Sequence, residues 1–268
     1  MAAGYTVFGS VRRLSDASHL SNTHGKRFVP LVFDVTDSAA LPGAVETVTR
    51  ELRGAPLTAL VNNAGISLSG PLMHQPIEEF RKTFEVNVFG VLQVTRAFLP
   101  LLGAGARPVA RPGRIVNIGS VSGAMTPPFM GAYSASKHAL EALGQALRRE
   151  LIPYGIEVST IEPNFIRSSI FEKTAALMKE SNYRDTHYEA MWQQFNRSLL
   201  EQEANAKPPQ KVSRAVLHAI QSKRPRPRYP LDPVWYLGRW APDRLFDKII
   251  LKAMGLHRMI REAPRSGS

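Results

Sequence analysis

Tyr133 and Lys137 are the residues whose types and spacing point most directly to proton chemistry. They stand four positions apart in a stretch with helical periodicity, so their side chains project from one face, one turn apart. A phenol with its usual pKa of about 10 is a poor acid or base at neutral pH, but a neighbouring ammonium favours the phenolate and lowers that pKa. The pair predicts a tyrosine that exchanges a proton with a substrate oxygen. Ordinary helices often contain a tyrosine and a lysine at this spacing, so the surrounding residues have to decide whether the pair is catalytic.

A serine and a turn of small residues occur where such a site would need them. Ser120 precedes Tyr133 by 13 residues and follows the apolar stretch Arg114–Ile118, which predicts a strand. Asn62-Asn63-Ala64-Gly65 follows a second apolar stretch, and its small residues would let the backbone approach a ligand. Because parallel sheets bind ligands at the carboxyl ends of their strands, we expect both segments at one edge of the sheet. For the turn alone, an ordinary tight turn is the competing interpretation.

Strands and helices alternate along most of the chain. This order predicts a single α/β domain, with a Rossmann-like, doubly wound parallel sheet covered by helices on both faces. We assign residues 1–230 to this domain and residues 231–268 to a basic amphipathic C-terminal extension. Asp37 or Ser38 would cap the first helix. The strands are expected at Thr6–Ser10, Phe28–Asp34, Leu57–Val61, Arg114–Ile118 and Ile156–Ile161, and the helices at Ser38–Arg53, Ile77–Leu102, Ala132–Leu151 and Val212–Ser222.

These motifs resemble, in order and spacing, those of the short-chain dehydrogenase/reductase family, over about Gly4 to Ile170. The resemblance implies an oxidoreductase in which Ser120 orients the substrate oxygen and Tyr133 exchanges the proton. It also implies that Lys137 binds the nicotinamide ribose while lowering the pKa of Tyr133, and that Asn87 holds a water in the proton relay. As a lone residue, Asn87 would be an ordinary polar group on a helix.

The resemblance also implies a set of cofactor contacts. The turn after the third strand would lie against the adenosine half of the cofactor, and the end of the second strand would contact the adenine. The segment after Pro163 would contact the nicotinamide amide. The residues concerned are Asn62, Asn63, Ala64, Gly65, Asp34, Val35, Ile166 and Ser168, together with Tyr133 and Lys137. By itself, Asp34 could equally be a turn or cap residue.

The residues after the first strand predict which nicotinamide cofactor is used. An acidic residue at this strand end would bind the ribose hydroxyl and repel a 2′-phosphate, whereas arginine accommodates the phosphate. The chain has Arg12 and Arg13 there and no carboxylate at the strand end, so we expect NADP(H) in preference to NAD(H). The alternative is a solvated basic loop.

The sequence departs from the family pattern in two places. The family's glycine-rich turn would lie before Gly4 and is absent, which predicts weaker binding of the pyrophosphate and exposed edges on the two strands that flank the missing strand. We therefore expect an N-terminally shortened version of a full enzyme. After Pro163 the chain has Asn164 where the family usually has glycine, and Ser168 where it usually has threonine. Asparagine can adopt the left-handed backbone and serine keeps a hydroxyl, so the contact with nicotinamide stays open.

Composition narrows the partners. There is no cysteine, so disulfides and thiolate chemistry are excluded, which is compatible with a cytoplasmic protein. No run approaches the roughly 20 apolar residues of a membrane span. The histidines show no metal-ligand spacing, and we expect no metal. The formal net charge of +12 fits a phosphorylated cofactor or an anionic membrane surface better than nucleic acid, for which no recognition motif appears. By resemblance, we expect a homodimer or homotetramer.

The substrate is expected to be a carbonyl or alcohol, and a lipophilic one. Phe171–Phe195 lies where such a fold would cover its crevice, and it is rich in large apolar side chains, although such residues are more often simply core. Its members of interest are Met178, Tyr183, Tyr188, Met191 and Trp192. The competing interpretation is a catalytically idle binding or scaffold protein, because the glycine-rich turn is missing.

The C-terminal extension raises a third possibility, an enzyme that works at a membrane surface. Pro242–Ile260 has helical periodicity, and Trp235, Tyr236 and Trp240 precede it. The expected apolar side of this helix consists of Leu245, Phe246, Ile249, Ile250 and Met254. Packing of this tail on the domain or on a partner subunit is the alternative to membrane contact.

Overall fold

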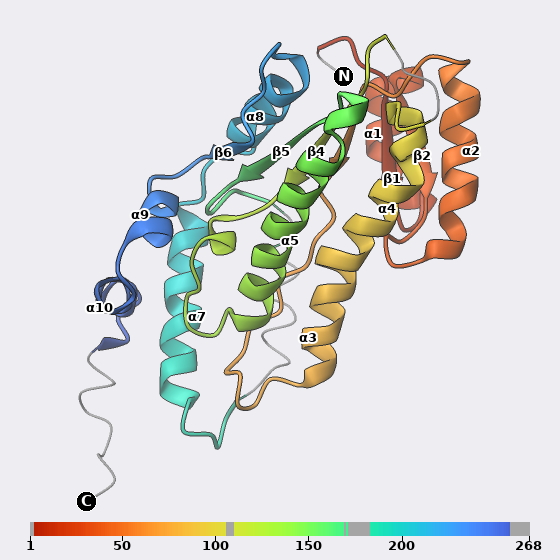
Figure 1. The fold of residues 1–268 in the computed structure, drawn as a ribbon. Helices are drawn as coiled ribbons and strands as arrows, with labels where there is room; N and C mark the ends of the chain where they lie inside the picture. Colours follow the sequence, from red (N-terminus) through yellow and green to blue (C-terminus); the bar gives the residue numbers. More distant parts are fainter. Residues whose placement is uncertain (1–2, 106–109, 169, 171–182, 258–268) are drawn as a thin grey trace, which may run out of the picture.

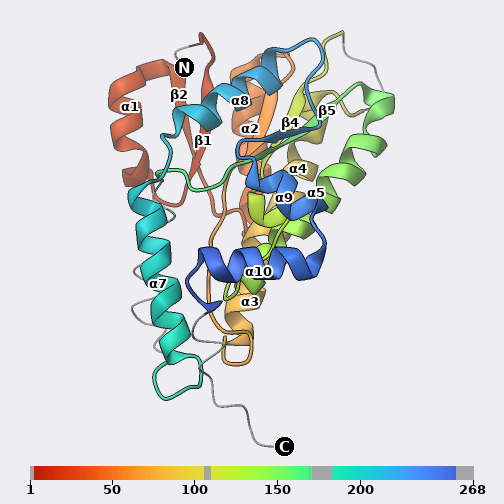
Figure 2. The same cartoon turned by 90° about the vertical axis from the view of Figure 1, so that its left-hand side faces the viewer.

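The computed structural model describes residues 3–105, 110–168, 170 and 183–257. Short parallel strands run through the middle of the molecule, and helices cover them on both faces (Figure 1). Helices α2, α4 and α5 lie over one face, and α1 and α8 lie over the other (Figures 1 and 2). The predicted Rossmann-like α/β fold is confirmed.

The strands form two parallel sheets. β1 pairs with β2, and a four-stranded sheet has the order β3-β4-β5-β6. Among the described residues no ladder joins β1 to β3, so each of these strands has an unpaired edge, as the missing strand predicts. The bounds are β1 Val7–Val11, β2 Phe28–Val32, β3 Ala59–Asn62, β4 Arg114–Ile118, β5 Glu157–Glu162 and β6 Arg228–Pro230.

The helices agree with the predicted periodicity, with two additions. The short helices α1 and α9 have no counterpart in the sequence-based prediction. Asp37 is the residue that caps the segment before α2, since its carboxylate accepts a hydrogen bond from the amide of Ala39. The bounds are α1 Ser18–His24, α2 Leu41–Leu52, α3 Ile77–Phe84, α4 Val91–Phe98, α5 Gly131–Glu150, α7 Glu189–Ala204, α8 Gln210–Gln221, α9 Val234–Trp240 and α10 Asp243–Ala253.

β4 is covered by apolar side chains on both of its faces. Successive side chains of a strand point to opposite faces. Ile115 is fully buried with Leu147 of α5, and Val116 is fully buried with Ala215 and Ala219 of α8. A strand covered on both faces is largely apolar, and the buried polar side chain of Asn117 has a partner, since its Oδ1 accepts a hydrogen bond from Asn62 at 2.9 Å. This strand positions Ser120 just beyond its end.

The stretch Ile77–Leu102 contains α3, a π-helical segment (Glu85–Gly90), α4 and a final 3-10 turn. Among the described residues it is the one segment long and apolar enough to cross a membrane by length and composition. It also carries three fully buried polar side chains, Thr83, Asn87 and Thr95. Because Val94 and Phe98 pack in the core with α2, we interpret it as a core helix.

Two glycines in helical segments should respond in opposite ways to alanine. A Cβ at Gly43 of α2 would meet nothing within 4 Å, so Gly43→Ala should stabilise the fold by about 0.5 kcal/mol through helix propensity. A Cβ at Gly90 would lie 2.9 Å from Cγ2 of Val35 and 3.1 Å from the carbonyl of Glu85, so Gly90→Ala should destabilise it by about 1–3 kcal/mol. Urea unfolding measures both. Equal effects would show that the packing of the π-helical segment on Val35 is not tight.

Candidate active site

The carboxyl ends of β3, β4 and β5 meet at one edge of the four-stranded sheet, and α5 begins beside them. The backbone cross-links these ends, because the amide of Gly119 donates to the carbonyl of Ile161 at 2.8 Å and that of Val121 donates to Pro163 at 2.9 Å. The loop that carries Ser120 is therefore fixed to the end of β5. The first two turns of α5 bring Tyr133 and Lys137 to the same place.

Lys137 is a buried cation held by the end of β4. Only 5% of the residue is exposed, and its Nζ donates to the carbonyl oxygen of Ile118 at 2.9 Å. The same Nζ lies 5.7 Å from the centroid of the Tyr133 ring. Burial disfavours the charged form and lowers the pKa of Lys137 to about 8.

Tyr133 shares its environment with Ser120. The residue as a whole is half-buried, whereas its hydroxyl is desolvated, and this burial raises the pKa of the phenol. A hydrogen bond between the hydroxyls of Tyr133 and Ser120 lowers the pKa and opposes part of that rise. Ser120 is fixed in turn, because its Oγ accepts a hydrogen bond from the amide of Ser122 at 3.1 Å.

The pKa of Tyr133 is therefore raised, and not lowered as we expected from the neighbouring Lys137. Removal of the phenol from water is the larger cause, and the opposing cause is the hydrogen bond with Ser120 rather than the ammonium of Lys137. A phenol with a raised pKa is protonated at neutral pH. In this arrangement Tyr133 therefore holds its proton.

Asn87 ties the site together with its side-chain amide. Its Oδ1 accepts from the amide of Ile66 at 2.9 Å, and its Nδ2 donates to the carbonyl of Ile66 and to Oγ of Ser136, each at 2.9 Å. Oγ of Ser136 donates to the carbonyl of Tyr133 at 2.7 Å. These hydrogen bonds use the side-chain amide of Asn87, which we expected from the resemblance to hold a water. The side chain of Asn87 instead positions the turn after β3 against α5.

Gly65 brings that turn next to Asn87 and Lys137. A Cβ at this position would lie 3.4 Å from Oδ1 of Asn87 and 3.8 Å from Nζ of Lys137. Asn63 and Ala64 are exposed beside it. Asn62 differs, because its amide donates to Oγ1 of Thr95 at 3.0 Å and to Oδ1 of Asn117 at 2.9 Å. Its side chain joins β3 to α4 and β4 and is not free for the cofactor contact we predicted.

At the ends of β1 and β2, two of the predicted cofactor residues have other partners. Asp34 accepts hydrogen bonds from the amide and the hydroxyl of Thr36, at 2.9 and 2.7 Å, which lower its pKa. Arg13 forms an ion pair with Asp16 at 3.0 Å. Arg12 is exposed. Its positive charge lowers the pKa of both Asp34 and Asp16, so it is near enough to interact with both carboxylates.

The remaining residues that we predicted to contact the cofactor are Val35, Ile166 and Ser168. Val35 packs against Gly90, and its carbonyl accepts from Nε2 of Gln93 at 2.8 Å. Ile166 forms a parallel bridge with Lys207, and Ser168 is exposed. Their contact with a nicotinamide amide stays a prediction.

A charged cluster behind Ser120 was missed by the sequence analysis. Glu162 ends β5 and is fully buried, and its Oε1 lies 3.7 Å from Nε of Arg228, which also donates to Oε2 of Glu141 at 2.9 Å. A Cβ at Gly119 would lie 3.6 Å from Oε1 of Glu141, so the cluster packs against the serine loop. Burial and the neighbouring Glu141 raise the pKa of Glu162 to about 9. The spacing of Glu141, one turn after Lys137, was its only signal in the sequence.

The apolar residues expected to cover the crevice form part of the core. Tyr183, Trp192 and Phe195 are buried with Phe129 and Met254, and Tyr188 and Met191 pack against this cluster. Met178 lies outside the described residues. Within this segment residues 183–188 are not helical, and the helix α7 begins at Glu189.

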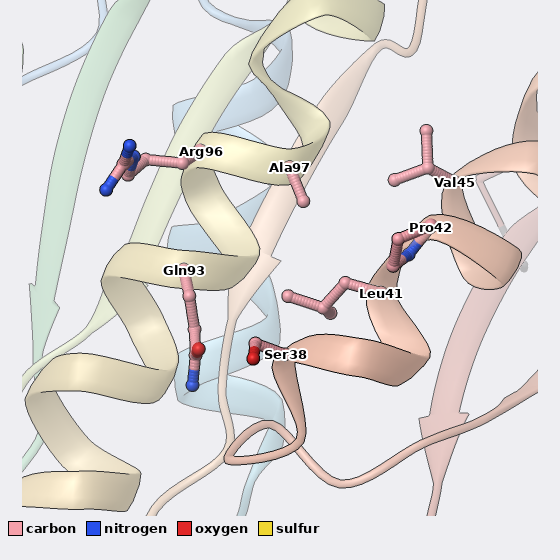
Figure 3. A pocket seen from close by; sticks show the side chains of 7 residues that line it. All are labelled: Ser38, Leu41, Pro42, Val45, Gln93, Arg96 and Ala97. Atoms are coloured by element: carbon pink, nitrogen blue, oxygen red, sulfur yellow. The ribbon is translucent and has the colours of Figure 1, made fainter.

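A separate pocket of about 390 Å³ lies between α2 and α4 (Figure 3). It contains none of the site residues above, and we assign it no catalytic role. Its lining residues are Ser38, Leu41, Pro42, Val45, Gln93, Arg96 and Ala97. In the part of the chain that the structure describes, no cluster of three or more His, Asp or Glu side chains is arranged to hold a metal ion.

Comparison with known proteins gives the class. The chain matches the model of the short chain dehydrogenase family over residues 1–179. It is 40% identical over 256 residues to the NADPH-dependent 3-dehydrocapnine reductase of Ornithobacterium rhinotracheale, covering 94% of this chain and 89% of that protein. It is 30% identical over 267 residues to human retinol dehydrogenase 5, covering 92% and 80% of the two chains.

Solved structures agree. A short-chain dehydrogenase from Streptomyces avermitilis superposes with a TM-score of 0.73 at 26% identity, covering 98% of this chain and 91% of that one. ElxO with NADP bound has the same fold, with a TM-score of 0.68 at 19% identity over 88% and 90% of the chains. The chain belongs to the short-chain dehydrogenase/reductase family. It is an oxidoreductase that acts on CH–OH groups with NAD(P).

Replacement of Glu162 by glutamine should change how stability depends on pH. The pKa of Glu162 is raised from its usual value of 4.5 to about 9, so its contribution to stability is complete below pH 4.5 and is lost as the pH rises toward 9. Glutamine cannot ionise. The stability of Glu162→Gln relative to the wild type should therefore grow between these pH values, by at most about 1.4 kcal/mol per unit.

Thermal unfolding from pH 5 to 9 measures this difference. Glu157→Gln, at the exposed start of the same strand, is the matched control and should leave the pH dependence unchanged. Parallel curves for Glu162→Gln and the wild type would contradict the raised pKa of Glu162.

Proposed function

We propose that this protein is an NADP(H)-dependent reductase that converts a ketone or aldehyde on a lipophilic substrate to the alcohol, with Tyr133 as the general acid. The observation that carries the proposal is the desolvated phenol of Tyr133 beside Ser120 and the buried Lys137. A protonated phenol at neutral pH favours the direction of carbonyl reduction. The name of the reductase that shares 40% identity supports the same direction.

The residues present fit a nicotinamide dinucleotide. Gly65 leaves room beside Lys137 that a Cβ would begin to fill, and Asn63 and Ala64 are exposed next to it. Lys137 would hold the nicotinamide ribose, and Val35 would lie near the adenine. The bound cofactor supplies a hydride to the substrate carbon. No glycine-rich turn for the pyrophosphate occurs among the described residues, so these side chains would contribute much of the binding.

In the reaction, this chain positions an oxygen and delivers a proton to it. The hydroxyl of Ser120 orients the carbonyl oxygen of the substrate toward Tyr133. The phenol of Tyr133 donates its proton as negative charge develops on that oxygen. Lys137 is charged below its pKa of about 8 and stabilises the phenolate that remains. Asn87 and Ser136 hold the backbone of the site and act as positioning residues.

A lipophilic substrate is supported by the rim of the site. The neighbouring side chains of Leu72 and Met73 are 65% and 76% exposed, which places two large apolar side chains in contact with solvent there. A Cβ at Gly131 would lie 2.6 Å from Cδ2 of Leu72, so Leu72 contacts the start of α5, two residues before Tyr133. Similar proteins named for retinol and for a 17-beta-hydroxysteroid support the same class of substrate.

Tyr133→Phe should lower kcat for carbonyl reduction by about 10²–10⁴-fold, because it removes the proton donor while keeping the ring. Binding of NADPH should change little. NADPH oxidation with a panel of ketones and aldehydes measures the first quantity, and NADPH fluorescence titration measures the second. Tyr154→Phe, which alters an exposed tyrosine, is the control. If Tyr133→Phe keeps full activity, the assignment of the acid is wrong; if the wild type binds NADPH without turnover, the idle binding protein is favoured.

Arg12→Ala should weaken binding of NADPH by roughly tenfold or more, while binding of NADH stays the same, because a charged hydrogen bond to the 2′-phosphate is lost. Arg13→Ala is the matched control. It should have a smaller effect, since Asp16 already engages this guanidinium. Titration of both cofactors against both variants measures the difference. An equal loss for NADH would mean that Arg12 does not contact the phosphate.

A further inference from the structure

Helices α9 and α10 lie together at one side of the molecule, and Figure 2 looks directly onto them. Each packs one face on the domain and leaves large apolar side chains exposed on the other. We refer to the exposed residues Tyr236, Leu237, Trp240, Leu245 and Ile249, with Arg239, Arg244, Lys248 and Lys252, as the α9–α10 surface.

α9 is fixed by its inner face. Trp235 is only 8% exposed, which corrects the expectation that it belongs to a membrane-facing group. A Cβ at Gly238 would lie 2.6 Å from Cβ of Met125, so glycine lets the helix approach the loop after Ser120 closely. Trp240, in contrast, is 75% exposed, with the guanidinium of Arg239 at 5.8 Å from its ring.

α10 is divided in the same way. Ile250 and Leu251 pack against the aromatic core cluster, in which Met254 is buried. Leu245 and Ile249, one turn apart, are exposed at 52% and 37%. The expectation of one common apolar side is therefore wrong, because this helix has an anchored apolar face and an exposed one.

The charges on α10 are arranged around the exposed pair. With about 100° between successive residues of a helix, Lys248 and Lys252 lie within about a sixth of a turn of Leu245, and Arg244 follows on the same side. Asp243 and Asp247 are two positions from Leu245 and lie about half a turn away. The exposed apolar pair is thus bordered by cations on one side.

We propose that the α9–α10 surface binds membranes that carry anionic lipid. Exposed tryptophan, tyrosine and leucine side chains suit the boundary between headgroups and acyl chains, and flanking lysines and arginines are attracted to anionic headgroups. Lysine and arginine side chains also extend past apolar residues and keep their charges in water. The inference concerns lipid binding and does not rest on the proposed reaction.

The test uses the full chain with phosphatidylcholine vesicles, with and without about one quarter phosphatidylserine. Co-sedimentation should show binding to the anionic vesicles only. Raising the salt from about 0.1 M to about 1 M, which shortens the screening length from about 10 Å to about 3 Å, should weaken it. Absence of binding to the anionic vesicles at low salt would overturn the proposal.

Two pairs of variants separate the apolar and the charged contributions. Trp240→Ser with Leu245→Ser, and Lys248→Glu with Lys252→Glu, should each weaken binding by roughly tenfold or more. Leu14→Ser with Ile152→Ser, and Arg50→Glu with Arg149→Glu, make the same changes at exposed positions elsewhere and should bind as the wild type does. Equal losses of vesicle binding in the variants and the controls would point to an effect of net charge and non-specific adsorption. That result would also overturn the proposal.

Tryptophan fluorescence gives a local readout. Trp192 and Trp235 are 4% and 8% exposed, so a blue shift on addition of vesicles should come from Trp240. Trp240→Phe should bind and lose the shift. If the serine variants instead change the oligomeric mass in sedimentation and vesicles have no effect, the surface is an interface between copies of this chain. NADPH oxidation in solution should be unchanged in all these variants, which distinguishes this test from that of the reaction.

Discussion

The contact on which the site depends is the hydrogen bond from the buried ammonium of Lys137 to the carbonyl of Ile118. A buried cation is stable only when its hydrogen bonds are satisfied. Here the end of β4 supplies a partner, because a strand that finishes at Ile118 leaves that carbonyl facing α5. The bond joins the catalytic helix to the sheet and fixes the distance between Lys137, Tyr133 and the loop of Ser120. Gly65 completes the arrangement by leaving the space beside Nζ.

One physical cause, removal from water, moves the two titratable groups in opposite directions. It lowers the pKa of Lys137 and raises that of Tyr133, so the neutral form of each side chain is favoured. The simple argument from spacing considered the attraction between a cation and a phenolate and left out the desolvation of the phenol. The result is a pair that keeps its proton on the tyrosine at neutral pH, while the lysine remains charged enough to stabilise the phenolate once the proton has left. Tyr133 thus holds the proton that reduction of a carbonyl requires.

The sequence predicted local features well and long-range ones poorly. The run Arg114–Ile118 was sufficient to give β4 with its observed bounds, because Ile115, Val116 and Ile118 are β-branched residues, which favour a strand that is covered on both faces. The phase of α5 followed from its apolar spacing. The cluster of Arg228 and Glu141 could not be found in this way, because 87 positions separate its members and only the pairing of β5 with β6 brings them together. The partners of the Asn62 side chain could not be found for the same reason, since they belong to α4 and β4.

Helix α9 connects the rear of the site with the outer surface, and its two faces differ in kind. Its inner side places Trp235 near the buried Glu162, whose pKa the indole lowers slightly, and Gly238 against Met125. The amide of Met125 donates to the carbonyl of Val121, next to Ser120, so the inner face supports the loop of the catalytic serine. The outer side carries Tyr236, Leu237 and Trp240, which are exposed. Because the supporting contacts all lie on one face, substitutions on the outer face change the surface while leaving the wall behind Ser120 in place.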